Sequence, residues 1–245
     1  MAAAASGVEE TEVLARRVVI MLCLCDGVLF RTKRFVPDYR YTTALVGNRN
    51  ADEVVVIDVT PAERRQEQRH LFYDALERYA ATCFSPIAVG GGIRTVEEAR
   101  QLIALAADKI VIGCHRLLGS FPNEVVDKLG RQALVAAVNH QGSDLGTERA
   151  RFWSRFAGEI LMNSIERDGS LQGYDLEALR AVADVDVPVM VAGGCGTWAH
   201  MAAAFEAGAS AACTSVIHHL TETSLAACKT WLAANCAQPV REAVT

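Results

Sequence analysis

Two glycine-rich segments, about a hundred residues apart, carry the clearest chemical signal in this sequence. Each has a proline, a short apolar run and a cluster of glycines, and they are Pro86–Arg94 and Val187–Gly196. Glycines directly after a buried strand let the backbone approach a ligand closely and leave amide groups free to bind an anion. One such turn is weak evidence, because strand ends often need glycine. Two turns at corresponding positions predict a pair of phosphate-binding sites.

Two further pairs of segments repeat at the same offset. Glu53–Asp58 matches Glu159–Ser164, and Ala107–Gly113 matches Ala209–Ser215. A unit of this length is longer than the repeats of solenoid proteins. With a chain of 245 residues, it predicts an α/β fold, a single (β/α)8 TIM barrel built from two four-strand halves. The barrel is expected to span residues 16–245, after a flexible leader of residues 1–15.

The apolar runs place the eight barrel strands at 18–24, 54–58, 87–89, 109–112, 133–138, 160–163, 189–192 and 211–214. Helical spacing and capping residues predict helices at 61–82, 95–106, 122–129, 175–182 and 197–207, with Thr95 and Glu98 as a capping box. A last helix is expected from Thr221 or Thr223 to about Ala234, and another from Tyr41 to Gly47, after a basic loop. Residues 141–157 are short for a loop plus a covering helix, and form the weakest part of the pattern.

Ligand-binding groups of such a barrel lie at the carboxyl ends of its strands. Glycine and hydroxyl residues dominate these ends in both halves, which favours two opposed phosphate sites. The predicted phosphate-binding residues are Gly91, Gly92, Gly113, Cys114, Gly169, Gly194, Gly196, Thr214 and Ser215. The alternative is that these glycines serve only tight turns. His218 and His219 lack a third partner for a metal, so no metal and no cofactor is predicted.

Composition narrows the class of protein. The net charge of −5 argues against general affinity for nucleic acid or an anionic membrane, and no apolar run approaches the roughly 20 residues that span a bilayer. The eight cysteines include no C-x-x-C pair, which favours free thiols in a reducing cytoplasm. The start of the chain is acidic and alanine-rich, unlike a signal peptide.

Motifs along the chain resemble the cyclase subunit of imidazole glycerol phosphate synthase, from Arg17 to about Leu232. The matching motifs are Asp26–Gly27, Val89–Ile93, Ala107–Lys109, Gly158–Ile160, Ser164–Gly169, Gly173–Asp175, Gly193–Gly196 and Ser215–His218. The resemblance implies a barrel that takes ammonia from a glutaminase subunit docked at its N-terminal face. It also implies that the barrel joins this ammonia to a bis-phosphorylated ribonucleotide, then cyclises and cleaves the product.

The resemblance also assigns an ammonia gate, a ring of four charged side chains at the bottom of the barrel. The matching residues are Arg17, Glu53, Lys109 and Glu159, each at the start of a predicted strand. All four keep the charge that the family has there. The alternatives are solvated rim charges, which contribute little, and a structural layer that only seals the barrel.

The opposite end departs from the family. Its general acid and base are two aspartates, and the aligned positions here hold Cys23 and Asn139. Asparagine cannot titrate, and a thiol between two leucines is more often inert. Asp58 and Asp168 are the remaining acidic candidates. Gly113 and Asn163 also replace an expected asparagine and threonine, and the loop after the fifth strand is shortened.

An intact ammonia inlet with a dismantled cyclisation site resembles one subgroup of this family. Its members work with a glutaminase in surface-polysaccharide synthesis and convert an acetamido group on a nucleotide-activated sugar into an acetamidino group. The segment Leu29–Phe35 resembles their first loop, where Arg31, Lys33 and Arg34 would suit a nucleotide diphosphate or simply be solvated. Two alternatives remain open: a true cyclase of histidine biosynthesis, and a non-catalytic barrel that activates a glutaminase.

Overall fold

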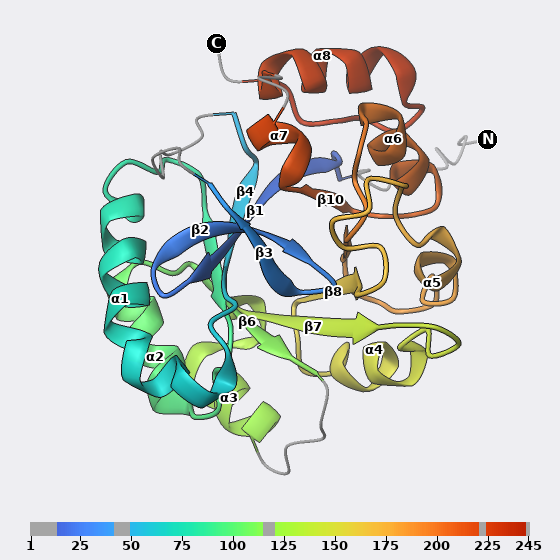
Figure 1. Cartoon of the computed structure of the whole chain (residues 1–245). Helices are drawn as coiled ribbons and strands as arrows, with labels where there is room; N and C mark the ends of the chain where they lie inside the picture. The colour runs from blue at the N-terminus through green and yellow to red at the C-terminus, as the bar shows by residue number, and fades with distance from the viewer. Residues whose placement is uncertain (1–13, 42–49, 115–120, 221–223, 244–245) are drawn as a thin grey trace, which may run out of the picture.

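The computed structural model describes residues 14–41, 50–114, 121–220 and 224–243, and its centre is a closed barrel of eight parallel strands (Figure 1). The barrel strands are β1 (Arg17–Cys25), β4 (Glu53–Asp58), β5 (Ile87–Gly90), β6 (Lys109–Gly113), β7 (Leu134–His140), β8 (Glu159–Ser164), β9 (Val189–Ala192) and β10 (Ala211–Thr214). Each pairs with the next, and β10 returns to β1 with Arg17 opposite Ala211. The predicted (β/α)8 TIM barrel is confirmed.

Helices surround the barrel. They are α1 (Ala62–Ala80), α2 (Val96–Leu105), α3 (Phe121–Leu129), α4 (Thr147–Trp153), α5 (Leu176–Arg180), α6 (Trp198–Glu206), α7 (Val216–Leu220) and α8 (Leu225–Asn235), with a short 3-10 helix at Arg131–Ala133. Thr95 and Glu98 form the predicted capping box at the start of α2. Within the described residues, no helix combines the length and apolar character needed to cross a membrane.

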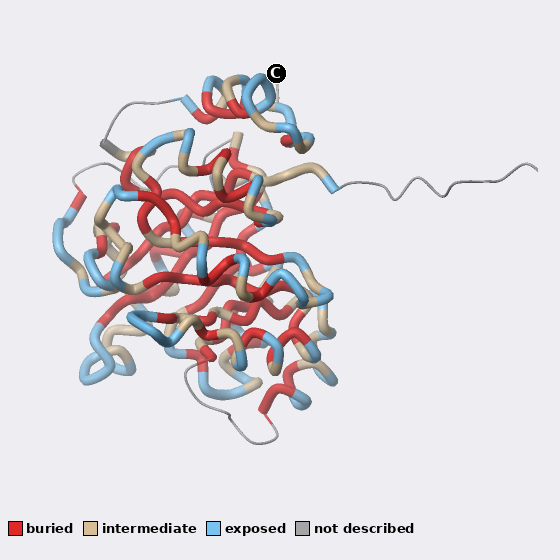
Figure 2. The backbone as a smooth tube through the Cα atoms, turned by 90° about the vertical axis from the view of Figure 1, so that its right-hand side faces the viewer, coloured by how far each residue is buried: buried red, intermediate tan, exposed pale blue. Residues whose placement is uncertain are grey.

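Two apolar cores result from this arrangement, because a barrel strand is covered on both faces. The larger core lies between strands and helices and includes the fully buried Trp153. The smaller core fills the barrel interior with side chains such as Val19, Val55, Val111 and Leu161. Figure 2 shows the buried strands as the red centre of the molecule, with exposed backbone at the periphery. The interior is therefore packed rather than an open pore.

The predicted basic loop after the first strand is wrong, because this segment forms an antiparallel hairpin. Its strands are β2 (Val28–Lys33) and β3 (Val36–Arg40), and β2 pairs with the end of β1. The hairpin crosses in front of the barrel in Figure 1. Arg34 and Phe35 have φ angles of 54° and 64°, the left-handed values that a two-residue hairpin turn requires. The sequence hides this turn because neither residue is glycine or asparagine.

Three other predictions concern helices. Residues 141–157 do hold a covering helix, α4. It has only seven residues, but it covers the barrel with the fully buried side chains of Ala150 and Trp153. The last helix starts at Leu225 with Ser224 as its N-cap, so the prediction that Thr221 or Thr223 begins it is wrong. The helix expected from Tyr41 to Gly47 lies outside the described residues beyond its first residue.

Candidate functional site

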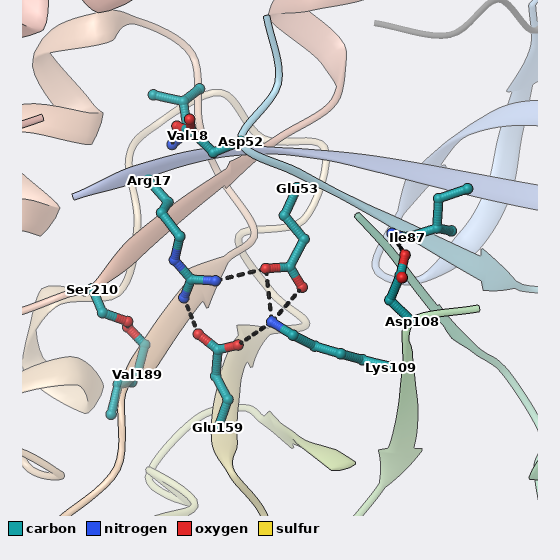
Figure 3. A network of polar contacts seen from close by, with 10 residues as sticks. All are labelled: Arg17, Val18, Asp52, Glu53, Ile87, Asp108, Lys109, Glu159, Val189 and Ser210. Atoms are coloured by element: carbon teal, nitrogen blue, oxygen red, sulfur yellow. Dashed lines mark hydrogen bonds and ion pairs between the residues drawn. The ribbon is translucent and has the colours of Figure 1, made fainter. Parts of the chain in front are cut away.

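A closed ring of ion pairs occupies the N-terminal end of the barrel. Arg17, Glu53, Lys109 and Glu159 start β1, β4, β6 and β8, and their side chains converge on one point (Figure 3). Arg17 Nη1 lies 2.6 Å from Glu53 Oε2, and Lys109 Nζ lies 2.9 Å and 3.0 Å from the two oxygens of Glu53. Lys109 also lies 3.1 Å from Glu159, which Arg17 contacts directly. Each cation therefore bridges both carboxylates.

Burial strengthens this ring. Burial alone would lower the pKa of Arg17, but the carboxylates of Glu159 and Glu53 outweigh it and raise that pKa above its ordinary value. The side chain of Lys109 is the most exposed of the four, at 24%, while those of Glu53 and Glu159 are almost fully buried. Such a layer can exclude bulk water and ions, and Lys109 is its most accessible member.

Neighbouring hydrogen bonds hold the strands that carry the ring. Asp52 Oδ2 accepts the amide of Val18 at 2.8 Å, and Asp52 Oδ1 pairs with the buried Lys229 Nζ of α8 at 2.7 Å. Asp108 Oδ2 accepts the amide of Ile87 at 2.7 Å. Asp52 and Asp108 directly precede the ring residues Glu53 and Lys109 in the sequence, and Figure 3 shows all four side chains. The positions of the ring side chains therefore depend on contacts between adjacent strands.

At the carboxyl ends of the strands, a cavity of about 760 Å³ opens to solvent. It brings together four residues predicted from the first half, Asp58, Gly91, Gly92 and Gly113, and one from the second half, Asn139. Gly91 has a φ of 106°, and a Cβ there would lie 2.3 Å from the carbonyl oxygen of Asp58. Only glycine fits at that point, which brings the backbone of the turn against the end of β4.

A second, much smaller cavity of about 30 Å³ lies beside the second half. It brings together the predicted residues Asp168, Gly169, Gly194, Thr214 and Ser215. The predicted Cys114 and Gly196 line neither cavity. The amide of Cys114 donates to Ala137 O at 2.8 Å, and that of Gly196 donates to His200 Nδ1 at 3.1 Å. Their amides are thus already engaged within the fold.

Cys23 and Asn139, near the carboxyl ends of β1 and β7, have no group that titrates near neutral pH. Cys23 is 3% exposed, with its Sγ 4.0 Å from Thr32 Oγ1 in the hairpin above it. Burial, with a smaller contribution from Asp168, raises the pKa of the Cys23 thiol to about 12. Asn139 accepts a hydrogen bond of 2.9 Å from the side-chain amide of Asn163. Cys23 and Asn139 are therefore both uncharged near neutral pH, and neither is suited to act as a general acid or base.

The two predicted acidic candidates at this end, Asp58 and Asp168, hold other parts of the fold. Asp58 is buried, forms an ion pair of 2.6 Å with Arg69 and accepts the amide of Thr60 at 2.9 Å. Asp168 accepts the amide of Phe35 at 2.9 Å and so fastens the hairpin turn. Burial raises the pKa of Asp168, although the bond from Phe35 opposes this effect. Of the two, Asp168 is better suited to carry a proton.

Sequence reasoning missed three arginines at the larger cavity. Arg65 and Arg94 line it, and Arg69 donates to both Asp58 and the carbonyl oxygen of Gly91. A signal was present, since Arg65 and Arg69 are four residues apart and share one face of the helix that follows β4. Among the described residues, no cluster of His, Cys, Asp and Glu could hold a metal ion.

Comparison with known proteins assigns this chain to a family. Residues 16–224 match the model of the family described as "Histidine biosynthesis protein". The chain is 34% identical to the imidazole glycerol phosphate synthase subunit HisF of Pyrococcus furiosus, over 91% of this chain and 97% of the relative.

Two further relatives have the same printed name. The HisF subunit of Streptomyces coelicolor is 34% identical over 84% of this chain and 89% of its own length. The subunit of Thermococcus gammatolerans is 33% identical over 90% and 96%. The match spans both ends of the barrel, and the chain belongs to the histidine biosynthesis protein family, in which it is similar to the HisF cyclase subunits.

Proposed function

We propose that this protein is the ammonia-using synthase subunit of a glutamine amidotransferase pair and that its acceptor site has diverged from the cyclase. In this proposal a glutaminase docks at the N-terminal face and ammonia enters through the ring of Arg17, Glu53, Lys109 and Glu159. The acceptor is a nucleotide-activated sugar, whose acetamido group becomes an acetamidino group for surface polysaccharide. Ammonia adds to the amide carbon and stays as the new nitrogen, and the amide oxygen leaves as water. Asp168 is the candidate proton carrier.

The observation that carries this proposal is the contrast between the charged ring at the N-terminal end and the carboxyl end of the barrel, which we call the mouth. The ring is complete, with every carboxylate bound to both cations. The mouth lacks a titrating pair, because Cys23 is a buried thiol with a pKa of about 12 and Asn139 is bound to Asn163. Cyclisation of the substrate to an imidazole needs general acid–base catalysis, which typically accelerates a reaction a hundredfold or more. Delivery of ammonia to another acceptor requires the ring but not that pair.

The N-terminal face also has features that suit a partner. Leu14, just before β1, and Phe84, in the connection that leads into β5, are 71% and 78% exposed. Both precede strand starts, so they lie on the same face as the ring. Exposed apolar side chains around a charged centre are typical of protein–protein contact surfaces. They support docking of the glutaminase here.

A second candidate is a true cyclase of histidine biosynthesis. The relatives reported above all have the name of the HisF subunit, at about one third identity across most of the chain. In that case Asp58 or Asp168 would have to replace the missing pair. Asp58 is already neutralised by Arg69, which weakens this candidate. A third candidate, a barrel that only activates its glutaminase, uses the ring face alone.

An ammonia-dependent turnover assay separates these candidates. The purified chain is mixed with an ammonium salt at high pH and either the cyclase family's bis-phosphorylated ribonucleotide or a diacetamido nucleotide sugar, and products are followed by mass spectrometry. We expect a small loss in mass, on the sugar only, because amidine formation replaces the amide oxygen, which leaves as water, with an NH group. Imidazole glycerol phosphate would establish the cyclase and overturn our proposal. Stimulated glutamine hydrolysis by a partner, with neither product, would indicate the activator.

A further inference from the structure

The larger cavity carries positive charge that the fold does not neutralise. Four arginines lie at or near this end of α1 and the β5 turn. Two of them have carboxylate partners: Arg69 pairs with Asp58 at 2.6 Å, and Arg64 pairs with Asp26 at 2.9 Å. Arg65 and Arg94 both line the cavity, and no carboxylate of the described residues lies within ion-pair distance of either. The cavity thus presents two cations to its interior.

Arg65 is held in place over the glycine turn. Its Nη2 donates to the carbonyl oxygen of Thr60 at 2.5 Å, which leaves Nη1 and Nε for other partners. Nε is buried and lacks a hydrogen-bond partner among the described residues. A Cβ on Gly92 would lie 2.5 Å from Arg65 Nη1, so the guanidinium lies directly across this glycine. A ligand that reaches the turn must contact the arginine.

Electrostatics make this arrangement unfavourable without a ligand. Burial lowers the pKa of Arg65, and the nearby charges of Arg69 and Arg94 lower it further, against the attraction of Asp58. A partly buried arginine beside two like charges is stabilised by an anion, and guanidinium groups bind phosphate oxygens through paired hydrogen bonds.

The second cavity differs in both size and charge. It measures about 30 Å³, enough for roughly one small group, against about 760 Å³ for the first. Within the described residues its lining includes no lysine or arginine and one carboxylate, Asp168. The two halves therefore do not offer equivalent phosphate sites, although their glycine motifs are alike. Two cations on one cavity suit two phosphates that are joined to each other.

We propose that Arg65 and Arg94 form a diphosphate clamp over Gly91 and Gly92, which recognises the diphosphate of a nucleoside diphosphate compound. This deepens the function proposed above and rests on it for the identity of the sugar, but not for the binding of a diphosphate. A substrate with two separate phosphates would place only one of them on this clamp. Arg65 would then determine which substrate the cavity accepts. Gly113, which also lines the cavity, has no side chain that could bind an anion.

Isothermal titration calorimetry on the full chain tests this clamp with inorganic phosphate, pyrophosphate and uridine diphosphate. We expect pyrophosphate and uridine diphosphate to bind at least tenfold more tightly than phosphate. Arg65→Gln and Arg94→Gln should each weaken pyrophosphate binding at least tenfold, and Arg65→Lys should retain part of it. Arg78→Gln is the matched control, because Arg78 is exposed on the same helix about 20 Å away. It should bind like the unmodified chain.

Two results would overturn the clamp. One is pyrophosphate binding that is unchanged in both Arg65→Gln and Arg94→Gln, and the other is equal affinity for phosphate and pyrophosphate. If Arg65→Gln does not fold, Arg94→Gln decides alone, since Arg94 is exposed and its side chain forms no hydrogen bond or ion pair with another described residue. A tight, arginine-dependent diphosphate site without amidine product would refute the proposed reaction and leave the clamp standing.

Discussion

The two ends of this barrel treat buried charge in opposite ways. At the N-terminal end, two cations and two carboxylates form a closed set in which each group has two partners. At the carboxyl end, Arg65 and Arg94 face a cavity without a carboxylate partner among the described residues. A closed set is complete without a ligand, whereas an open one is completed by an anion. In the proposed function, this difference separates the ammonia gate from the site that binds the acceptor.

The largest expected effect comes from opening the ring. Glu53→Gln removes the carboxylate that both Arg17 and Lys109 contact and leaves Glu159 to balance two cations. Breaking a buried pair in this way costs about 3 kcal/mol or more, so we expect the free energy of unfolding in urea to fall by about 3 kcal/mol. The control is Asp184→Asn, which removes an exposed pair with Arg151. If Glu53→Gln is no more destabilising than this control, the ring is only a solvated rim.

A second test concerns the buried thiol of Cys23, near the carboxyl end of β1. With a pKa of about 12, the Cys23 thiol is ionised in about one molecule in ten thousand at pH 8. Cys236 and Cys83 are partly exposed. We expect iodoacetamide to modify both at least a hundredfold faster than Cys23, as measured by peptide mass spectrometry. In urea, all eight cysteines should react alike; preferential labelling of Cys23 in the folded chain would mean an activated thiol.

A smaller effect is expected at Asp58, the buried carboxylate that pairs with Arg69. Arg69→Met leaves the buried Asp58 with only the amide of Thr60. Loss of a hydrogen bond to a charged group should lower the free energy of unfolding by about 2 kcal/mol. Arg64→Met breaks a half-exposed pair with Asp26 and should lose less than about 1 kcal/mol. Adding Asp58→Asn should recover part of the loss, and a strictly additive cycle would contradict direct pairing.

The smallest effect is a pH dependence from Asp168. Its folded pKa is raised by burial, so its contribution to stability is full below the ordinary value of about 4 and declines as the pH rises through the folded value. Asp168→Asn keeps an acceptor for Phe35 but removes this decline. We expect its Tm to match the unmodified chain near pH 4 and to exceed it by about 1–3 °C at pH 7. A difference in Tm between Asp168→Asn and the unmodified chain that stays constant with pH would show that ionisation of Asp168 does not lower the stability of the fold.

Much of the barrel was predictable because its signals are local. A buried parallel strand needs a continuous apolar run, and a helix start needs a cap, so strands such as β4 and the capping box at Thr95 could be read directly. The hairpin β2–β3 could not, because its turn uses Arg34 and Phe35 at positive φ. That turn is held by Asp168, which is 133 residues away from Phe35.

The candidate site divides in the same way. Glycine motifs predict where the backbone turns, but they do not say which amides remain free. Those of Cys114 and Gly196 are engaged by Ala137 and His200, whereas Gly91 and Gly92 face the cavity. The two glycine turns look equivalent in sequence, but the cavities that they line measure about 760 Å³ and about 30 Å³. Of the two arginines that line only the larger cavity, Arg94 ends the first glycine-rich segment, whereas Arg65 lies on α1 outside both segments.

The sequence by itself determined the alternation of strands and helices, the twofold repeat and the placement of Arg17, Glu53, Lys109 and Glu159 at strand starts. Periodicity and strand polarity are properties of neighbours in the chain, which is why they could be read there. Only the tertiary structure decided which charges are satisfied. Arg17 meets Glu159 across 142 residues, and Arg65 faces a cavity with no carboxylate partner in the described residues. Coulomb interactions act through space, so closure of the barrel made one end neutral and left the other in need of an anion.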